Sequence, residues 1–365
     1  MSTMRAMVLM GHGGLDKYAW RTDWPRPTPG PGEALVRVLA CGLNNTDVNT
    51  RTGWYSKGVT GATTGEAESD ADPADSTWGG AGISFPRIQG ADVAGRVEAV
   101  GQGADPALVG RRVLIDTWLR DWDDPLNIEK MGYFGAEADG GFAEYTTVDA
   151  RNVHPIDCAL SDAELASFPT SWVTAENMLN RAAVGAGDSV LITGASGGVG
   201  SALIQLARRR GAQTMAIAGG SKADQVRALG PTAVIDRAAT ADARALKAAI
   251  HAAIGRNTVT VLADVVGGDA FPTLLERVAR GGRYTCAGAI AGPMVQLDLR
   301  TLYLRDLTFT GATTVPPGTF ADLVGYIAQG EVTPVLAATY PLERLAEAQT
   351  AFIAKAHIGN IVVVP

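Results

Sequence analysis

The second half of the chain alternates short apolar runs with segments whose apolar residues recur every three to four positions. The short runs predict strands, and the helical spacing between them predicts helices at 199–210, 221–229 and 241–254. Such strand–helix alternation is typical of an α/β protein with a doubly wound parallel sheet. The expected strands are 189–193, 214–218, 233–235, 259–265, 283–287 and 307–311.

The first half of the chain shows a different pattern, in which brief apolar stretches are separated by glycine and proline. This pattern predicts a β-rich, barrel-like region. Its expected strands are 4–10, which we place at a sheet edge, 34–40, 92–100 and 111–115. Between them, residues 56–85 contain few apolar residues and predict a long surface loop, which is usually a functional or mobile feature.

The C-terminal pattern returns to that of the first region. It predicts helices at 320–329 and 342–355 and a closing strand at 360–364. We therefore expect two domains. A discontinuous catalytic domain is expected to comprise 1–155 and 312–365, and a nucleotide-binding domain 156–311.

A glycine-rich turn follows the first strand of the α/β region, in the sequence Val-Leu-Ile-Thr-Gly-Ala-Ser-Gly-Gly-Val-Gly. A strand, a turn of this kind and a helix form the fingerprint of dinucleotide binding. The glycines permit a tight turn, a close approach of the backbone to a pyrophosphate, and contact between helix and strand. The expected cofactor contacts are Gly194, Ala195, Ser196, Gly197, Gly198, Val199 and Gly200.

Composition narrows the classes of partner. The 365 residues carry a net charge of −7 and contain no basic run, so neither nucleic acid nor an anionic membrane is expected as a partner. No apolar run is long enough to span a membrane, and we find no signal peptide. Cys41, Cys158 and Cys286 are scattered and odd in number, which predicts reduced, buried thiols and a cytoplasmic protein.

Five strings together resemble the medium-chain dehydrogenase/reductase superfamily. They are the glycine-rich turn, Cys41–Asp47, Gln89–Gly101, Gly140–Tyr145 and Ala263–Gly268. The resemblance implies a GroES-like catalytic domain, a Rossmann domain that binds NAD(P), a small-molecule substrate and a homodimer formed through the Rossmann edge.

Departures from the zinc alcohol dehydrogenase pattern indicate the branch. The positions of its catalytic zinc ligands fall on Asn44, Ala91 and Thr170, of which none is a good zinc ligand. Residues 116–131, where a structural zinc lobe would lie, contain no cysteine. The chain therefore resembles the zinc-free quinone oxidoreductase and enoyl reductase branch, and we expect no metal.

Without a Lewis acid, hydride transfer needs an acceptor that is already activated, such as a quinone or a C=C bond conjugated to a carbonyl. The protein must then supply hydrogen-bond donors to the developing enolate. Tyr55, at the end of a segment that resembles the family's Asn-x-x-Asp…Gly-x-Tyr, is the expected donor, and Asn44 is a second polar group. Alternatively, Tyr55 anchors the loop that follows it.

Cofactor choice follows from the strand near residue 218, which ends without the acidic residue that NAD-binding domains place there. Ser221 and Lys222 stand there instead, and a hydroxyl and an ammonium suit a 2′-phosphate. Arg237 is expected to add a further contact, so we predict NADPH. Alternatively, Lys222 is a solvated residue and Arg237 a surface ion-pair partner. The resemblance also implies contacts from Thr174, Val266 and Gly288.

The sequence thus predicts an NADPH-dependent, zinc-independent reductase of enoyl, enone or quinone acceptors. An alcohol dehydrogenase or carbonyl reductase of the same superfamily is one alternative, and a non-catalytic NADPH-binding protein is another. Arg51, Lys57 and Arg87 offer limited support for a coenzyme A thioester as substrate. Four aromatic residues either line a substrate cleft or pack the barrel, and packing is favoured: Trp118, Trp122, Tyr133 and Phe134.

Overall fold

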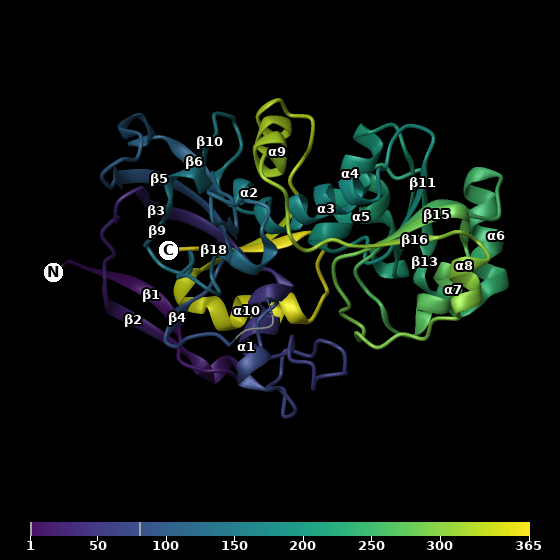
Figure 1. The fold of residues 1–365 in the computed structure, drawn as a ribbon, viewed down its shortest axis with the longest axis horizontal. Helices are drawn as coiled ribbons and strands as arrows, with labels where there is room; N and C mark the ends of the chain where they lie inside the picture. The colour runs from purple at the N-terminus through teal and green to yellow at the C-terminus, as the bar shows by residue number, and fades with distance from the viewer. Residues whose placement is uncertain (1, 80–81) are drawn as a thin grey trace. The chain divides into compact units, whose positions relative to one another are not determined.

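The structure is a computed structural model that describes residues 2–79 and 82–365 (Figure 1). It divides into two compact units, and each is described here by itself. Unit 1 comprises Met1–Val59, Thr64–Thr170 and Pro316–Pro365, and unit 2 comprises Thr60–Thr63 and Ser171–Val315. Residues 156–170, which we expected in the nucleotide-binding domain, lie in unit 1.

Unit 1 begins with a three-stranded sheet in the order β2-β1-β4. Its central strand is β1 (Thr3–Leu9), which pairs antiparallel with β2 (Tyr18–Pro25) and with β4 (Arg87–Ile88). The prediction of an edge strand at residues 4–10 was therefore wrong. Because β2 is half-buried or exposed along its length, it lacks the apolar alternation that would have revealed it as a partner.

A seven-stranded sheet forms most of the barrel, in the order β10-β6-β5-β3-β18-β17, with β9 paired to β3. The closing strand of the C-terminal segment thus pairs with the N-terminal region, as the sequence pattern indicated. A further pair joins β7 (Trp118–Leu119) to β8 (Gly132–Tyr133). The bounds in the large sheet are β3 (Glu33–Gly42), β5 (Asp92–Val100), β6 (Arg112–Ile115), β9 (Tyr145–Asp149), β10 (Val153–Pro155), β17 (Leu336–Pro341) and β18 (Asn360–Val364).

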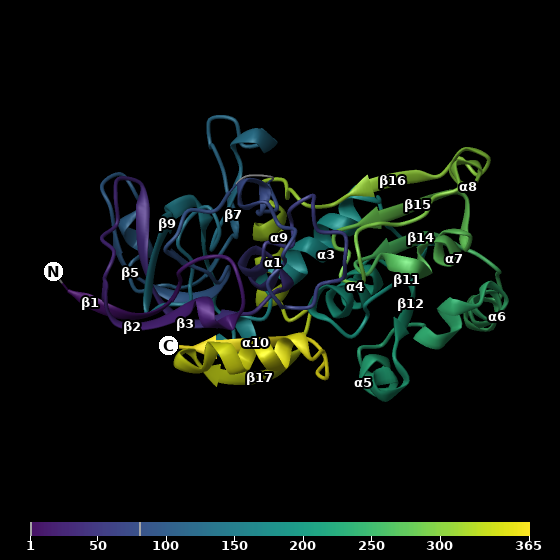
Figure 2. The same ribbon diagram turned by 90° about the horizontal axis from the view of Figure 1, so that it is seen from below.

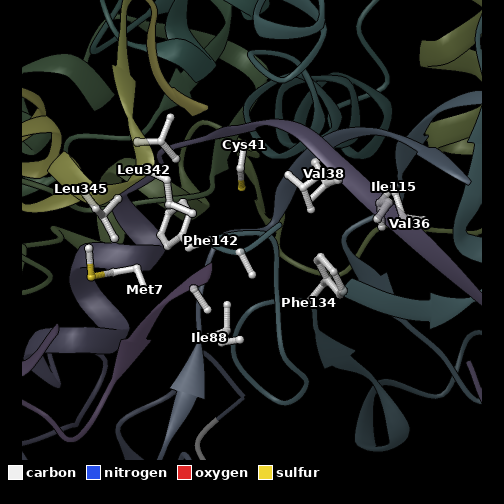
Figure 3. Packing of buried hydrophobic residues seen from close by; sticks show 14 of the residues in the cluster. Met7, Val36, Val38, Cys41, Ile88, Ile115, Phe134, Phe142, Leu342 and Leu345 are labelled. Atoms are coloured by element: carbon white, nitrogen blue, oxygen red, sulfur yellow. The ribbon is translucent and has the colours of Figure 1, made fainter. Parts of the chain in front are cut away.

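Inward-facing side chains of these strands form one apolar cluster (Figure 3). Phe134 and Phe142 are fully buried in it, beside Cys41. The expectation of buried thiols is thus confirmed for Cys41, whereas Cys158 and Cys286 are half-buried; all three cysteines are free. Because a buried aromatic ring contributes a large apolar area, each of these two phenylalanines adds substantially to the apolar burial of this core.

Helices of unit 1 lie between and beside the strands. The C-terminal helix α10 packs on β17 and β18 (Figure 2). The predicted helix 342–355 is divided into a 3₁₀ turn and α10, since backbone geometry changes at Arg344. The helices are α1 (Asn45–Thr52), α2 (Asp162–Leu165), α9 (Thr319–Ala328) and α10 (Leu345–Ile353), and 3₁₀ turns occupy Leu15–Lys17, Pro73–Asp75, Pro106–Leu108, Ile128–Lys130, Ala150–Asn152 and Leu342–Arg344.

Unit 2 contains a six-stranded parallel sheet in the order β13-β12-β11-β14-β15-β16 (Figure 2). In sequence order this is 3-2-1-4-5-6, the order of dinucleotide-binding sheets, with the switch point between β11 and β14. The predicted doubly wound parallel sheet is confirmed. The strands are β11 (Ser189–Ile192), β12 (Gln213–Ala218), β13 (Ala233–Asp236), β14 (Val259–Asp264), β15 (Val278–Cys286) and β16 (Thr308–Gly311).

Helix α3 (Pro169–Arg181) begins in unit 1 and continues into unit 2. Its N-terminal residue is proline, which is favoured at this position because its fixed φ suits a first helical turn. The remaining elements of unit 2 are α4 (Gly198–Arg209), α5 (Ala223–Ala228), α6 (Ala243–Ile254), α7 (Phe271–Leu275) and α8 (Leu299–Tyr303), with 3₁₀ turns at Gly220–Lys222, Arg237–Ala241 and Gly268–Ala270.

The predicted loop at 56–85 contains one short 3₁₀ turn in its described part. His12 helps to hold it, since its ring nitrogens lie 3.0 Å from the Thr50 carbonyl oxygen and 2.8 Å from Ser76 Oγ. Within unit 2, Thr63 N–H donates to the Ile290 carbonyl at 3.1 Å. Across the described residues, no helix combines the length and apolarity that a membrane crossing needs.

Candidate cofactor and active-site residues

The glycine-rich turn of unit 2 has the geometry that its sequence predicts. Gly194 follows β11 with a φ of +58°, a left-handed conformation that favours glycine. A Cβ atom at Gly200 would lie 2.2 Å from the Gly194 carbonyl oxygen and 2.6 Å from Ala195 Cα. Both neighbours are backbone atoms that cannot move aside, so glycine at position 200 allows α4 to lie directly on the turn.

Helix α4 begins directly at the end of this turn. Its N-cap is Gly197, which has no side chain to satisfy the first N–H groups of the helix. Ser196, Gly198 and Val199 flank this N-terminus, and no acidic residue stands in the first helical turn. Free N–H groups and the positive end of the helix dipole suit a phosphate group.

Two loops converge on the same turn from neighbouring strands. A Cβ atom at Gly194 would lie 3.3 Å from Val266 Cγ2, in the loop after β14. A Cβ atom added to Gly288, in the loop after β15, would lie 3.3 Å from the Val265 carbonyl oxygen. The structure thus brings Gly194, Val266 and Gly288 together at the carboxyl ends of the strands, where open α/β sheets bind ligands.

Asp264 organises this convergence and was not singled out from the sequence, although it stands in the Ala263–Gly268 string. Its Oδ1 accepts a hydrogen bond from Thr193 Oγ1 at 2.6 Å. The same oxygen accepts the backbone N–H groups of Val266 at 2.9 Å and Gly267 at 3.2 Å. Because Asp264 is fully buried, these bonds are shielded from water and fix the loop after β14 beside the glycine-rich turn.

The residues predicted to bind a 2′-phosphate gather near the end of β12. Burial lowers the pKa of Lys222 below its usual value, and the positive charge of Arg237 lowers it further, so the two cations lie close to each other. The Arg237 Nη2 atom would be 3.8 Å from a Cβ at Gly219, and Ser221 stands in the adjacent 3₁₀ turn. Two mutually repelling cations at one point favour an anion between them.

Thr174 lies half-buried on α3, in the part of that helix that belongs to unit 2. Its contact with a cofactor stays a prediction, as do the roles of the other residues assigned from the sequence.

In unit 1, two of the three positions that the resemblance assigns to zinc ligands, Asn44 and Thr170, lie in a buried polar network around Asp92. Asp92 Oδ1 accepts the backbone N–H of Thr170 at 2.9 Å and also the Thr170 hydroxyl. The Thr170 hydroxyl lies 2.6 Å from the Tyr133 hydroxyl. Burial raises the pKa of Asp92 to about 6, against the opposing hydrogen bonds from Thr170 and Asn44.

These residues do not fit a zinc ion. Ala91 offers no ligating atom, and the hydroxyl and amide of Thr170 and Asn44 are weak zinc ligands that are already engaged with Asp92. Among residues 2–79 and 82–365, no group of three histidine, cysteine, aspartate or glutamate side chains could hold a metal ion. The donor set thus disagrees with a catalytic zinc.

Asn44 is also the N-cap residue of α1. Its backbone N–H donates to Asp47 Oδ2 at 2.7 Å, which closes the first helical turn. Burial raises the pKa of Asp47 to about 7, and the nearby Asp92 carboxylate raises it too. Burial therefore shifts both carboxyl groups toward their neutral forms, and the shift is larger for Asp47 than for Asp92.

Arg51 has a structural role. It is fully buried and donates to the carbonyl oxygens of Gly13 at 2.6 Å and Gly65 at 3.1 Å, and to Gln349 Oε1 at 3.2 Å. A guanidinium held in this way is not available to a coenzyme A phosphate, so Arg51 does not support a thioester substrate; whether the substrate is a thioester stays a prediction. Arg87 is likewise engaged, with Asp139 at 3.0 Å.

Tyr55 follows the C-terminus of α1, where Gly53 adopts a φ of +84°. Burial raises the pKa of the Tyr55 phenol above its usual value, against smaller opposing effects from hydrogen bonds with Thr46 and Asn49. The phenol is therefore protonated at neutral pH and able to donate. These contacts fit both interpretations of Tyr55, as a proton donor and as an anchor for the loop.

The aromatic residues mostly pack against each other. Trp118 and Tyr133 are buried, with ring centroids 5.3 Å apart, and Trp78 lies edge-on to Trp118 at 4.9 Å. Trp122 is half-buried, with the Arg151 guanidinium 5.1 Å from its ring centroid. The favoured interpretation, packing, agrees with these contacts, while the Tyr133 hydroxyl extends the polar network of Thr170.

Two family models match the chain. The model described as alcohol dehydrogenase GroES-like domain matches residues 30–158, and the one described as zinc-binding dehydrogenase matches residues 198–329. Together they cover parts of both units. The second name refers to a family whose zinc ligands this chain lacks at the positions described above.

Three known proteins resemble the chain over nearly its full length. A structure from Sinorhizobium meliloti 1021, provisionally described as an alcohol dehydrogenase, is 43% identical with a TM-score of 0.89 and covers 100% of this chain and 97% of its own. The quinone oxidoreductase of Homo sapiens is 25% identical, covering 94% of this chain and 92% of its own length. The crotonyl-CoA carboxylase/reductase AntE in complex with NADP is 25% identical with a TM-score of 0.85, covering 99% and 94%.

Proposed function

The chain belongs to the medium-chain dehydrogenase/reductase superfamily, in its quinone oxidoreductase- and enoyl reductase-like branch, and on this premise we propose that it is an NADPH-dependent reductase of activated double bonds or quinones. The observation that carries the proposal is the network of Asn44, Asp92 and Thr170. Thr170 donates two hydrogen bonds to Asp92, and Asn44 influences the same carboxyl group, so two of the three positions that the resemblance assigns to zinc ligands lie around a buried aspartate. An acceptor for this site must therefore be activated by its own conjugation.

NADPH, when bound, supplies a hydride. The protein must then stabilise the negative charge that develops on the carbonyl oxygen of an enone, and it must deliver a proton to the α-carbon. We assign these tasks to Tyr55, whose raised pKa keeps the phenol protonated, and to the Asn44 amide as a second donor. Asp92, through its hydrogen bonds, orients Asn44 and Thr170.

The cofactor assignment is supported by unit 2. The N-terminus of α4 and the glycine-rich turn suit the pyrophosphate, and the loop with Val266 and Gly288 lies beside that turn. Ser221, Lys222 and Arg237 suit a 2′-phosphate because two neighbouring cations gain from an anion between them. The NADP in the similar AntE structure supports the same choice.

An alcohol dehydrogenase or carbonyl reductase is a second candidate. It is favoured by the 43% identity with the Sinorhizobium meliloti protein. Such an enzyme would have to polarise its carbonyl substrate with Tyr55 or another hydrogen-bond donor in place of zinc. The two candidates differ in which bond of an unsaturated aldehyde receives the hydride.

The experiment that separates them follows NADPH oxidation with an α,β-unsaturated aldehyde and identifies the product. A saturated aldehyde is the expected product, because hydride adds to the β-carbon. An allylic alcohol would refute double-bond reduction and support the second candidate. If NADPH binds without turnover on this aldehyde, on a quinone and on an enoyl thioester, the protein is a non-catalytic NADPH-binding protein.

The role of Tyr55 is tested by Tyr55→Phe, which keeps the ring and removes the donor. Loss of one donor to a developing oxyanion lowers kcat by about 100-fold, with little effect on KM. Tyr145→Phe is a matched control, since Tyr145 lies on β9 with its ring against Arg26. If Tyr55→Phe retains the wild-type kcat, Tyr55 is an anchor for the loop.

We also propose a cytoplasmic location. The three cysteines are free, as is usual in a reducing compartment.

A further inference from the structure

Unit 2 contains a hollow of about 570 Å³ beside the starts of β14 and β15, which we call the basic hollow. Its ten lining residues come from α6, from the chain around the starts of these two strands, and from the segment between α8 and β16. Figure 2 shows α8 on the side of the sheet where β15 and β16 begin. A volume of this size lies within the range of sites for small molecules.

The charge of the basic hollow is opposite to that of the chain. Its lining contains four cations and one glutamate, a net charge of +3, whereas the whole chain carries −7. The four cations are Lys247, Arg277, Arg280 and Arg305. Four like charges around one hollow raise the electrostatic energy of the free protein, and an anion bound among them lowers it.

Two of these cations are held in place by neutral carbonyl groups. Arg305 Nη1 donates to the backbone carbonyl oxygen of Glu276 at 2.7 Å. Arg280 Nη2 donates to the Leu304 carbonyl oxygen at 2.7 Å. The ion pair of Arg280 with Asp306 is 3.9 Å long and joins side chains that are 76% and 77% exposed, so water screens it. The carbonyl groups thus orient both guanidinium groups and leave their positive charge available to a ligand.

Arg277 adds a donor that lacks an acceptor. Its side chain is 13% exposed, and its Nη2 lies 3.3 Å from Glu276 Oε2. Its Nε is buried and has no hydrogen-bond partner among the residues that the structure describes. A buried N–H group without an acceptor costs free energy, and an oxygen atom of a ligand in the hollow would supply that acceptor.

The basic hollow is distinct from the cofactor site. In its lining, Thr258 precedes β14 and Val278 begins β15. The glycine-rich turn, by contrast, follows the end of β11. Since the strands are parallel, the hollow and the turn lie at opposite ends of the strands, and a ligand in the hollow would not compete with NADPH.

We propose that the basic hollow is a second ligand site, which binds a small organic molecule with two phosphoryl groups. Two phosphate monoesters carry about −3 to −4 at pH 7, which matches the +3 of the hollow. Guanidinium groups suit phosphate because their N–H groups form paired hydrogen bonds with its oxygen atoms. Asn257 and Thr258 in the lining can donate further hydrogen bonds, and Leu304 offers an apolar contact to the carbon skeleton.

The lining disfavours other anions. None of the ten lining residues is aromatic, so the base of a nucleotide would find no ring on which to stack. A nucleic acid would extend beyond the hollow and be repelled by a chain whose net charge is −7. A single phosphoryl group, with a charge of about −2, would leave part of the positive charge of the hollow unbalanced. An organic bisphosphate therefore suits the basic hollow best.

Calorimetric titration of the full chain with fructose 1,6-bisphosphate tests this site. NADPH is kept at saturation, so that the sugar phosphate cannot occupy the phosphate-binding parts of the cofactor site. The bisphosphate is expected to bind about tenfold more tightly than fructose 6-phosphate, because its second phosphoryl group contacts further cations. The proposal is overturned if the bisphosphate does not bind, or if the monophosphate binds equally well.

Variants of the lining then locate the bound ligand. Lys247→Gln with Arg280→Gln removes two cations at exposed residues and is expected to raise the Kd of the bisphosphate by about 5- to 30-fold. Glu276→Gln removes the carboxylate of the lining and is expected to lower the Kd by about two- to fivefold, a gain that unfolding cannot imitate. Arg227→Gln with Arg344→Gln is the matched control, because both arginines are exposed and lie outside the hollow. Equal Kd values for all these proteins, an equal loss of affinity in the control, or weaker binding by Glu276→Gln would each overturn the proposal.

Discussion

The pair Lys222 and Arg237 gives the sharpest test of the cofactor assignment. Because the charge of Arg237 lowers the pKa of Lys222, the two cations repel each other in the free protein. A 2′-phosphate between them would relieve this repulsion and accept charged hydrogen bonds from both. The ribose of NADH offers only hydroxyls at this point. Lys222→Ala combined with Arg237→Ala is therefore expected to weaken NADPH binding and to leave NADH binding almost unchanged.

The magnitude follows from the exposure of the two side chains. A charged hydrogen bond contributes about 1.5–3 kcal/mol when water is excluded. Arg237 is exposed and Lys222 partly so, and solvent screening reduces each contribution to about 0.5–1 kcal/mol. Removing both costs about 1–2 kcal/mol, which corresponds to about a 5- to 30-fold increase in the Kd of NADPH.

Calorimetric titration of the double variant with NADPH and with NADH measures both constants. Arg227→Ala with Arg244→Ala is the control, because it removes the same charge from exposed positions on α5 and α6 of the same unit. The control is expected to bind both cofactors as the wild type does. Equal loss of NADPH and NADH binding in the Lys222/Arg237 variant would refute the reasoning, as would unchanged NADPH binding.

Two further predictions concern stability. Gly200→Ala would place a Cβ 2.2 Å from the Gly194 carbonyl oxygen, and overpacking of this kind costs about 1–3 kcal/mol; urea unfolding without cofactor measures it, and an unchanged midpoint would contradict the contact. The pKa of Asp47 is raised by burial to about 7 in the folded protein, so the folded state binds a proton that the unfolded chain releases above about pH 4. Between pH 4 and 7 the Asp47 carboxyl ionises in the unfolded chain but stays protonated in the folded protein, so relative to Asp47→Asn the wild type should lose on the order of 2–4 kcal/mol of unfolding free energy. Parallel pH profiles of the two proteins would exclude this.

The parts of the fold that the sequence revealed are those with strong apolar patterning. The strands at 92–100 and 360–364 have the predicted bounds, and α4 begins one residue before the predicted helix. The buried part of β18 includes the continuous apolar run Ile361–Val363, and the second half of β5 alternates exposed and more buried positions, so both strands show clearly in the sequence pattern. The glycine-rich turn was equally clear because its spacing reflects close backbone contact, as Gly200 shows.

Elements stabilised by capping and long-range contacts were not predicted. Helix α1 is built from asparagine, threonine, aspartate, arginine and a single valine, most of them poor helix formers. It forms because Asp47 accepts the Asn44 N–H at its start and Gly53 ends it in a left-handed conformation. Its buried Arg51 hydrogen-bonds a glutamine 298 residues away, a pairing that no local pattern indicates.

The polar network at the positions that correspond to zinc ligands in alcohol dehydrogenases also depends on contacts between residues far apart in the sequence. These contacts show what the side chains at those positions do in place of binding zinc. Asp92 and Thr170 lie 78 residues apart, yet one carboxylate oxygen binds both the backbone N–H and the hydroxyl of Thr170. A buried carboxylate without partners would be costly, so Asp92 needs these donors as much as they need an acceptor. Placing cysteine at position 170 would remove the hydroxyl donor, and a histidine at Ala91 would enlarge a fully packed position beside the same carboxylate. Introducing zinc ligands at these positions would thus disrupt the existing hydrogen-bond network before it created a metal site. The proposed reaction therefore relies on hydrogen-bond donors of the protein and on an acceptor that is already activated.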